Sequence, residues 1–224
     1  MKFFIDSADP EEIRRAIGSN LASGVTTNPG LLGRQGRGAS PREALKRVLD
    51  AAAGHPVFVQ VLCGDAAGQV EEAKRLSSIG ENIAIKVILG EEALKSIPAM
   101  VSLGLRVAAT TVNSVGRALL AANAGAHYVI PYYGWIEQTV DRSTNLAADI
   151  AAVYRAGGYD TQLVLYARDL RHVLDGALAG AFACTMEAEN LRKLFFHPQS
   201  EVAVRDHREA WEARFGNVTW LDAP

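Results

Sequence analysis

Short apolar runs recur along this chain, and an amphipathic segment follows each of them. Each run is four to six residues long and mostly apolar at both odd and even positions. Strands that are covered on both faces have this pattern. The eight runs are Lys2–Asp6, Gly24–Thr27, Val57–Leu62, Ile83–Val87, Arg106–Ala109, His127–Ile130, Gln162–Leu165 and Phe182–Thr185.

The segments between the runs have the signals of helices. Asp9 precedes the first, Pro10–Ile17, and is suited to cap it. The others are predicted at Pro41–Ala53, Asp65–Ser78, Glu91–Ser102, Ser114–Asn123, Arg142–Arg155, Asp169–Ala179 and Glu187–Phe195. Eight strands, each followed by a helix, predict an α/β fold in which residues 1–224 form a single (β/α)8 TIM barrel. An open doubly wound sheet is the alternative, but it would leave several helices without a place.

A further helix is predicted at the C-terminus, over residues 199–216 and centred on Glu201–Phe215. Its apolar residues are Val202, Val204, Trp211 and Phe215. A helix with such anchors needs a surface to pack on. The pattern leaves open whether that surface is its own barrel or a neighbouring subunit.

Composition and charge narrow the class of protein. The chain has 224 residues, of which 49% are hydrophobic and 21% charged, as in globular domains. A net charge of −2 offers no general attraction to nucleic acid or to an anionic membrane. No apolar stretch approaches the ~20 residues that span a bilayer, and the N-terminal run is too short for a signal peptide. Cys63 and Cys184 form no metal-binding or redox motif. We therefore expect a cytoplasmic protein.

Lys86 is the most informative polar residue because it interrupts an otherwise apolar strand, Ile83–Leu89. Alternation places Lys86 on the same face as Ala84, which predicts that it points into the barrel. Chemistry in TIM barrels occurs at the carboxyl ends of the strands. Desolvation lowers the pKa of a lysine, and a neutral amine condenses with ketones to form an imine. A lysine that pairs with a carboxylate for purely structural reasons is the alternative.

Other polar side chains are predicted to meet Lys86 at the same end of the barrel. Asp6 ends the first strand, and a carboxylate can assist the proton transfers of imine formation. Gln60, Thr110 and Tyr132 end or follow the third, fifth and sixth strands, where they can orient a water or shuttle a proton. Each has an ordinary structural explanation: Asp is common in turns, and Tyr132 can be a packed aromatic.

Other motifs are weaker. Gly33–Gly38 superficially resembles a phosphate-binding loop but lacks the spacing of one, so we interpret it as a solvated loop from which Arg34 or Arg37 could attract an anion. The histidines show no metal-binding pattern, and no GxSxG elbow is present.

The chain resembles the small transaldolase and fructose-6-phosphate aldolase family over nearly its whole length. The stretches that carry the resemblance are Phe3–Asp6, Gly24–Pro29 (GVTTNP), Ile85–Val87, Ala124–Tyr132 and His197–Pro198. The resemblance implies that Lys86 forms the imine, that Asp6 is catalytic and that Asn28, beside Thr27, binds the hydroxyketone. It implies no metal and no organic cofactor. It also implies a homo-oligomer, often a decamer, in which the C-terminal helix docks on a neighbouring subunit.

Positions that differ within the family favour its aldolase branch. Gln60, Ala108 and Tyr132 stand where transaldolases usually have Glu, Asn and Phe. A tyrosine can protonate the enamine and release free dihydroxyacetone.

The acceptor side of the predicted site departs from both branches. Arg168 keeps a cation where the family binds the acceptor phosphate, but Tyr166 and Trp135 replace a serine and an arginine, and Ile88 and Ile130 replace proline and a small residue. These changes predict an unphosphorylated, larger or more hydrophobic aldehyde.

The resulting hypothesis is a class I aldolase that joins or cleaves a dihydroxyacetone-type donor and an aldehyde acceptor. A transaldolase with a specialised acceptor and a barrel that binds sugars without turnover are the alternatives. A phosphate-dependent isomerase is less well supported, because neither a clear base nor an intact phosphate site is present.

Overall fold

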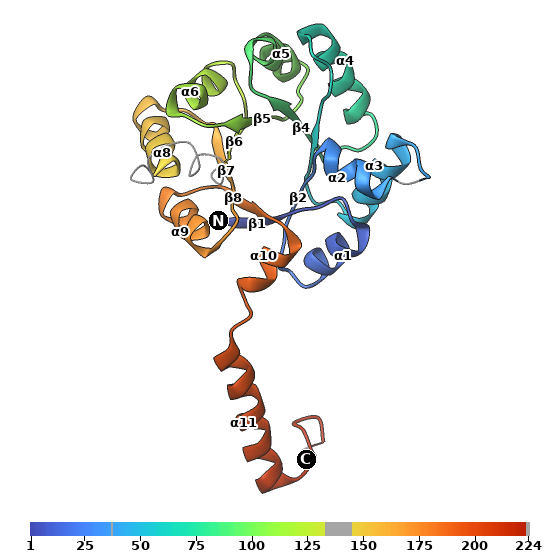
Figure 1. The fold of residues 1–224 in the computed structure, drawn as a ribbon, viewed down its shortest axis with the longest axis vertical. Helices are drawn as coiled ribbons and strands as arrows, with labels where there is room; N and C mark the ends of the chain where they lie inside the picture. Colours follow the sequence, from blue (N-terminus) through green and yellow to red (C-terminus); the bar gives the residue numbers. More distant parts are fainter. Residues whose placement is uncertain (37, 133–144, 223–224) are drawn as a thin grey trace.

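The structure is a computed structural model in which residues 1–36, 38–132 and 145–222 are described. Eight parallel strands form a closed barrel in which each strand pairs with the next along the chain and β8 pairs with β1 (Figure 1). The strands are β1 (Lys2–Asp6), β2 (Val25–Thr26), β3 (Val57–Gln60), β4 (Ile83–Ile88), β5 (Val107–Val112), β6 (Tyr128–Pro131), β7 (Gln162–Tyr166) and β8 (Ala183–Met186). The predicted TIM barrel is therefore confirmed.

Helices surround the barrel and begin at the predicted kinds of residue. Their bounds are α1 (Pro10–Gly18), α2 (Pro29–Gln35), α3 (Pro41–Ala51), α4 (Ala66–Ser77), α5 (Glu91–Ser102), α6 (Val115–Asn123), α8 (Leu146–Gly157), α9 (Leu170–Ala179), α10 (Ala188–Lys193) and α11 (Pro198–Phe215). Asp9 caps α1 by accepting hydrogen bonds from the backbone N–H groups of Glu11 and Glu12. At α3, Ser40 and Glu43 form a reciprocal capping box.

Helix α2 differs from the sequence-based expectation. Gly33–Gly38 was expected to be a loop, but residues 33–35 complete this helix. Asn28 caps it by accepting a hydrogen bond from Leu31 N at 3.0 Å, and Pro29 occupies its first turn. Proline has no backbone N–H to leave unpaired at this position, so the Asn-Pro pair starts a helix although glycines follow.

The end of β5 also differs from the simple strand that was expected. The strand continues to Val112, and its register with β6 shifts between Thr110 and Val112. Thr111, at the shift, has a φ of 59°, which is rare for a β-branched residue. Because of this bulge, the side chains at the end of β5 do not alternate strictly between the two faces of the strand.

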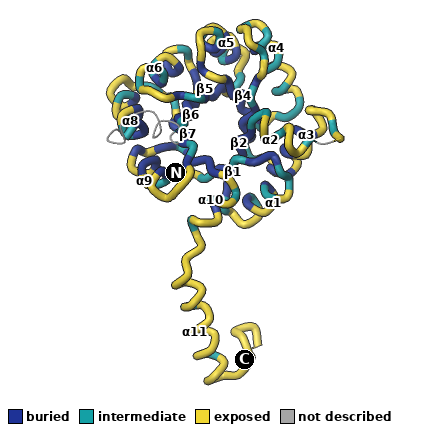
Figure 2. The backbone as a smooth tube through the Cα atoms, in the orientation of Figure 1, coloured by how far each residue is buried: buried dark blue, intermediate teal, exposed yellow. Residues whose placement is uncertain are grey.

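The core has two layers. Side chains such as Ile83, Ile85 and Val87 pack between the barrel and its helices, whereas Ala84 belongs to the barrel interior. Aromatic rings fill much of the interior: Phe4 and Phe58 have centroids 5.6 Å apart, and Phe58 and Tyr128 are 5.1 Å apart. The central strands are accordingly buried (Figure 2).

Helix α11 projects away from the barrel (Figures 1 and 2), and none of its residues is buried. Trp211 contacts Phe215 and Trp220, with centroids 4.6 and 5.0 Å apart, which forms a small aromatic cluster at its far end. In the described part of the chain, no helix combines the length and apolar character needed to cross a membrane.

Candidate active site

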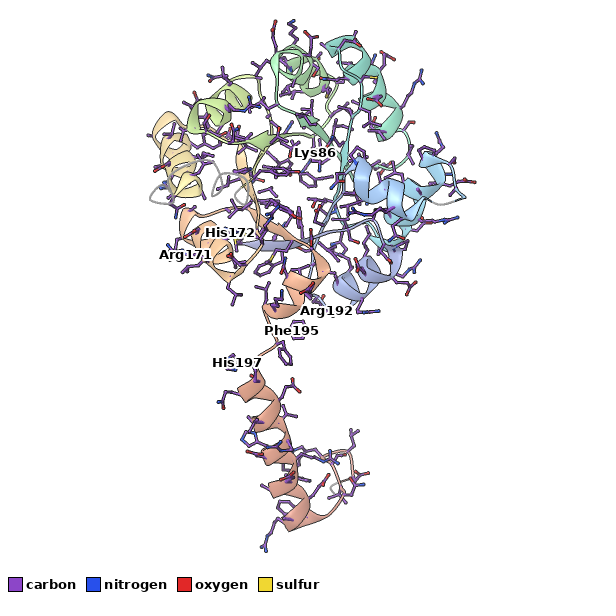
Figure 3. The ribbon with its side chains drawn as sticks, in the orientation of Figure 1. Lys86, Arg171, His172, Arg192, Phe195 and His197 are labelled. Atoms are coloured by element: carbon purple, nitrogen blue, oxygen red, sulfur yellow. The ribbon has the colours of Figure 1, made fainter. Side chains whose placement is uncertain are left out.

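Lys86 lies in β4 inside the ring of strands (Figure 3), and only 3% of its surface is exposed. It is in register with Gln60 of β3 and Ala108 of β5. Its Nζ donates a hydrogen bond to the backbone carbonyl of Thr27 at 2.6 Å. The alternation of β4 thus places the lysine in the interior.

Burial lowers the pKa of Lys86, because an ammonium group loses hydration in this position. The negative charge of Asp6 acts in the opposite direction and raises it. Burial is the larger effect. The amine is therefore more often neutral, and more nucleophilic, than an exposed lysine at the same pH.

Asp6 ends β1 at the same end of the barrel and accepts a hydrogen bond at 2.6 Å from the hydroxyl of Thr26. The Thr26 hydroxyl also lies 2.5 Å from that of Thr185. Because a hydroxyl has one hydrogen to donate, Thr185 must donate to Thr26 when Thr26 donates to Asp6. Three strands, β8, β2 and β1, therefore orient the carboxylate.

The pKa of Asp6 is raised, chiefly because burial disfavours the carboxylate. The Thr26 hydrogen bond and the positive charges of Lys86 and Arg34 lower it, and the negative charge of Glu187 raises it. A carboxyl group with a raised pKa beside an amine with a lowered pKa is an arrangement suited to exchange protons.

Tyr132 follows β6, and burial raises the pKa of its phenol. The charge of Asp6 raises this pKa further, and the nearby hydroxyl of Thr110 lowers it. Thr110 Oγ1 is buried and lies close enough to the Tyr132 hydroxyl to interact with it. Buried hydroxyls of this kind usually bind a water or a ligand.

Tyr166, at the end of β7, stacks on Tyr132 with the ring centroids 5.4 Å apart and the planes at 22°. Its hydroxyl donates to Oε1 of Glu187 at 3.2 Å. On the outer side, the guanidinium of Arg168 lies 5.9 Å from the Tyr166 ring centroid. Burial, with the charges of Asp6 and Glu187, raises the pKa of Tyr166 to about 12.

A hydrogen bond from its backbone N–H group fixes the position of Arg168. Its N–H donates to Nδ1 of His172, a histidine of α9 that is almost fully buried. His172 lies in the helix layer rather than at the centre of the barrel (Figure 3). The histidine is therefore structural, whereas the exposed Arg168 side chain can reach a substrate.

Asn28 and Thr27 follow β2, and both also make hydrogen bonds within the protein. The Oδ1 of Asn28 accepts the α2 cap hydrogen bond, which leaves its Nδ2 group as the donor for a ligand. Thr27 contacts Lys86 through its carbonyl, and its buried Oγ1 has no hydrogen-bond partner among the described residues. These two residues therefore orient the lysine and the α2 segment.

No group of three or more His, Cys, Asp or Glu residues in the described part of the chain is arranged to hold a metal ion. The polar groups close to Lys86 are instead one carboxyl, hydroxyls and amides. Such a set can bind a polyhydroxylated carbonyl compound and transfer protons to and from it.

Comparison with known proteins gives the same family as the motifs. The family described as Transaldolase/Fructose-6-phosphate aldolase matches residues 3–220. The chain belongs to this family. Two of its relatives, each called a probable transaldolase, come from Aquifex aeolicus (36% identity, 95% of this chain and 97% of the relative) and Desulfotalea psychrophila (37%, 96% and 99%). A third, from Methanococcus maripaludis, is 35% identical over 95% of this chain and 98% of its own length. The protein is thus an enzyme of the aldolase/transaldolase type.

A more distant likeness concerns the fold alone. A mutant of flavocytochrome b2 with benzoylformate superposes with a TM-score of 0.60 at 12% sequence identity. The match covers 85% of this chain and 58% of that one.

Several of the residues predicted for the site of this aldolase-family enzyme lie at the same end of the barrel as Lys86. Gln60, Asp6, Thr110, Tyr132 and Tyr166 all occur at carboxyl ends of the strands. Trp135 lies outside the described residues.

Three residues were not predicted to contribute: Thr26, Thr185 and Glu187. Thr26 could have been found from the sequence, since it shares its strand end with Thr27. The contribution of Thr185 depends on barrel closure, and that of Glu187 on the direction of the Tyr166 side chain.

Proposed function

We propose that this enzyme is a Schiff-base aldolase that uses Lys86 to join or cleave a dihydroxyacetone-type donor and an aldehyde acceptor. The observation that carries the proposal is a buried lysine, with a pKa lowered by burial, beside a carboxyl group. Membership of the family supports the same reaction type.

Imine formation begins with attack of neutral Lys86 Nζ on the ketose carbonyl carbon. Asp6 assists the proton transfers through which the carbinolamine oxygen leaves as water and a protonated imine remains. Nδ2 of Asn28 donates to a ketose hydroxyl. In the resting enzyme the carbonyl of Thr27 accepts a hydrogen bond from Nζ, so this bond holds the amine until it reacts.

Carbon–carbon cleavage follows from the charge on the imine. A base removes the proton of the C4 hydroxyl, the C3–C4 bond breaks, its electron pair moves towards the iminium to give an enamine, and an aldehyde leaves. Tyr132 relays this proton through a water held with Gln60 and Thr110: its phenol oxygen accepts from the water while its own proton passes to the Asp6 carboxylate, so the phenol stays protonated for the later step. The buried hydroxyl of Thr110, which lowers the pKa of the Tyr132 phenol, supports this water position.

The fate of the enamine separates aldolase from transaldolase activity. Protonation at carbon, followed by hydrolysis of the imine, releases dihydroxyacetone, whereas attack on a second aldehyde completes a transfer. Tyr132 provides the proton for the first fate. Transfer between sugars is the second candidate function, because the relatives are named probable transaldolases.

The test is intact-mass analysis after borohydride reduction with dihydroxyacetone or fructose 6-phosphate. We expect one covalent adduct per chain, which peptide mapping assigns to Lys86. Lys86→Met should remove both adduct and turnover while the protein stays folded. Lys74→Met, which changes an exposed lysine of α4, is the matched control and should retain both.

Failure to trap any ketose would favour a barrel that binds sugars without turnover. An adduct at another lysine would contradict the assignment of the nucleophile.

A further inference from the structure

We infer that the acceptor side of this site selects an uncharged polyhydroxy aldehyde over a phosphorylated one, and that Glu187, held by Tyr166, is the residue that determines this choice. The inference rests on the proposed function, since it concerns the aldehyde that the enamine attacks. It begins with the position of Tyr132.

The acceptor must approach Tyr132, because this phenol exchanges the proton at the carbon–carbon step. Tyr166 covers one face of the Tyr132 ring, with the centroids 5.4 Å apart. A parallel bridge between the two residues also connects their backbones. A pair of stacked phenols therefore forms the wall of the site next to the reacting carbons.

The hydroxyl of Tyr166 directs a carboxylate towards this wall. Glu187 follows β8 and accepts the Tyr166 hydrogen bond at 3.2 Å. Glu187 forms no ion pair with another described residue, and its carboxylate accepts from Tyr166. A carboxylate accepts hydrogen bonds from substrate hydroxyls and repels a phosphate.

Two arginines at the same end of the barrel carry positive charges that could offset the negative charge of Glu187. Arg168 lies 5.9 Å from the Tyr166 ring centroid, and both Arg168 and Arg34 are exposed. At Tyr166 the charge of Glu187 has a larger effect than that of Arg168. At Asp6 it has a larger effect than that of Arg34. The negative charge of Glu187 therefore acts on both Tyr166 and Asp6.

The selected step is an ordinary aldol addition. The enamine carbon on Lys86 attacks the aldehyde carbon, the carbonyl oxygen takes a proton from Tyr132, and water hydrolyses the resulting iminium. The distal hydroxyls of the acceptor then lie near Glu187. The hydrogen bond from Tyr166 fixes the direction of this carboxylate.

The experiment compares kcat/KM for D-glyceraldehyde and D-glyceraldehyde 3-phosphate, with dihydroxyacetone as donor. We expect the parent enzyme to favour glyceraldehyde. Glu187→Gln should shift the ratio of the two constants about tenfold towards the phosphorylated aldehyde, because one negative charge is removed. Tyr166→Phe keeps the stacking and the carboxylate but removes the hydrogen bond that directs it, so it should shift the ratio in the same direction by less.

Glu189→Gln is the matched control. It removes the charge of another exposed glutamate of α10, which is paired with Lys193, and it should leave the ratio unchanged. High salt, at which the Debye length falls to about 3 Å, should reduce the preference in the parent more than in Glu187→Gln.

Three outcomes would overturn the inference: a parent that prefers the phosphorylated aldehyde, equal shifts in Glu187→Gln and Glu189→Gln, or a Tyr166→Phe shift as large as that of Glu187→Gln. Borohydride trapping of dihydroxyacetone is measured in parallel on every variant. Loss of trapping in the parent would reject the proposed function itself, whereas trapping without the expected preference would reject only the role of Glu187.

Discussion

Thr26 donates its hydroxyl hydrogen to Asp6 at 2.6 Å and thereby connects the carboxyl group of β1 to the neighbouring strand. This hydrogen bond lowers the pKa of Asp6, against the larger effect of burial, which raises it. The bond stabilises the ionised form of a carboxyl group that would otherwise stay protonated to higher pH.

Replacement of Thr26 by valine should therefore shift the acidic side of the pH–rate profile upward. Without this hydrogen bond the pKa of Asp6 rises further. A higher pH is then needed to remove the proton from the Asp6 carboxyl group beside Lys86. We expect kcat/KM at neutral pH to fall about tenfold, as for other hydrogen bonds to charged groups. The measurement is kcat/KM for aldol cleavage across pH. Thr185→Val, which leaves the Thr26–Asp6 bond in place, should shift the profile less, and an unchanged or downward shift in Thr26→Val would contradict the assignment.

Tyr132→Phe should change the balance between release and transfer. The phenylalanine keeps a ring for Tyr166 to stack on but cannot protonate the enamine. We expect the ratio of transfer to free dihydroxyacetone release to rise by roughly tenfold or more, in line with the usual contribution of a general acid. Product analysis with and without an added aldehyde gives this ratio. Equal loss of both activities would refute the role of Tyr132.

Thr111 provides a test of backbone strain beside the site. A non-glycine residue with its φ of 59° costs roughly 1–2 kcal/mol, whereas glycine adopts this conformation freely but loses about 0.5–1 kcal/mol through its more flexible unfolded state. Thr111→Gly relieves the strain but also loses the hydrogen bond from Thr111 Oγ1 to the Thr110 carbonyl, so the free energy of unfolding should change by no more than ~1 kcal/mol. Thr111→Val keeps the strain and loses the hydrogen bond from Thr111 Oγ1 to the Thr110 carbonyl, so it should be destabilising by ~1 kcal/mol. Urea unfolding measures both, and a glycine variant less stable than the valine variant would contradict the account.

Helix α11 should mediate assembly. Its 18 residues bury no side chain on their own barrel, and helices without such packing are only marginally stable in water. We expect the full chain to sediment as a homo-oligomer, with α11 docked on a neighbour, and a chain ending at His197 to form smaller species. The number of subunits, up to the decamer that the family resemblance implies, comes from the same experiment. A full-length monomer that unfolds with the same stability as the truncated chain would exclude this role.

The barrel itself could be predicted because every strand carries its own signal. The alternation of isoleucine with alanine and lysine in β4 indicates which face of the strand points inward, so the inward direction of Lys86 was predicted correctly. Helix ends followed from single capping residues such as Asp9 and Ser114. Glu91–Ser102 was predicted with its observed bounds.

What could not be predicted depends on contacts between distant parts of the chain. Thr185 orients Asp6 only because β8 closes on β1 and places its hydroxyl beside Thr26. The bulge at Thr111 has no residue signature, since threonine rarely adopts a positive φ. The sequence indicated Glu187 only as the start of a helix. Its hydrogen bond with Tyr166 depends on the direction of the Tyr166 side chain.

The aromatic packing inside the barrel has a kinetic consequence. Phe4, Phe58 and Tyr128 occupy the axis, and the side chain of Arg106 donates to the Tyr128 hydroxyl from below at 3.2 Å. These side chains fill the barrel interior, so we expect both aldehydes to enter and leave at the carboxyl ends of the strands, where Lys86 lies. The departing aldehyde has to leave before the next arrives, and double-reciprocal plots of the transfer reaction should accordingly be parallel lines.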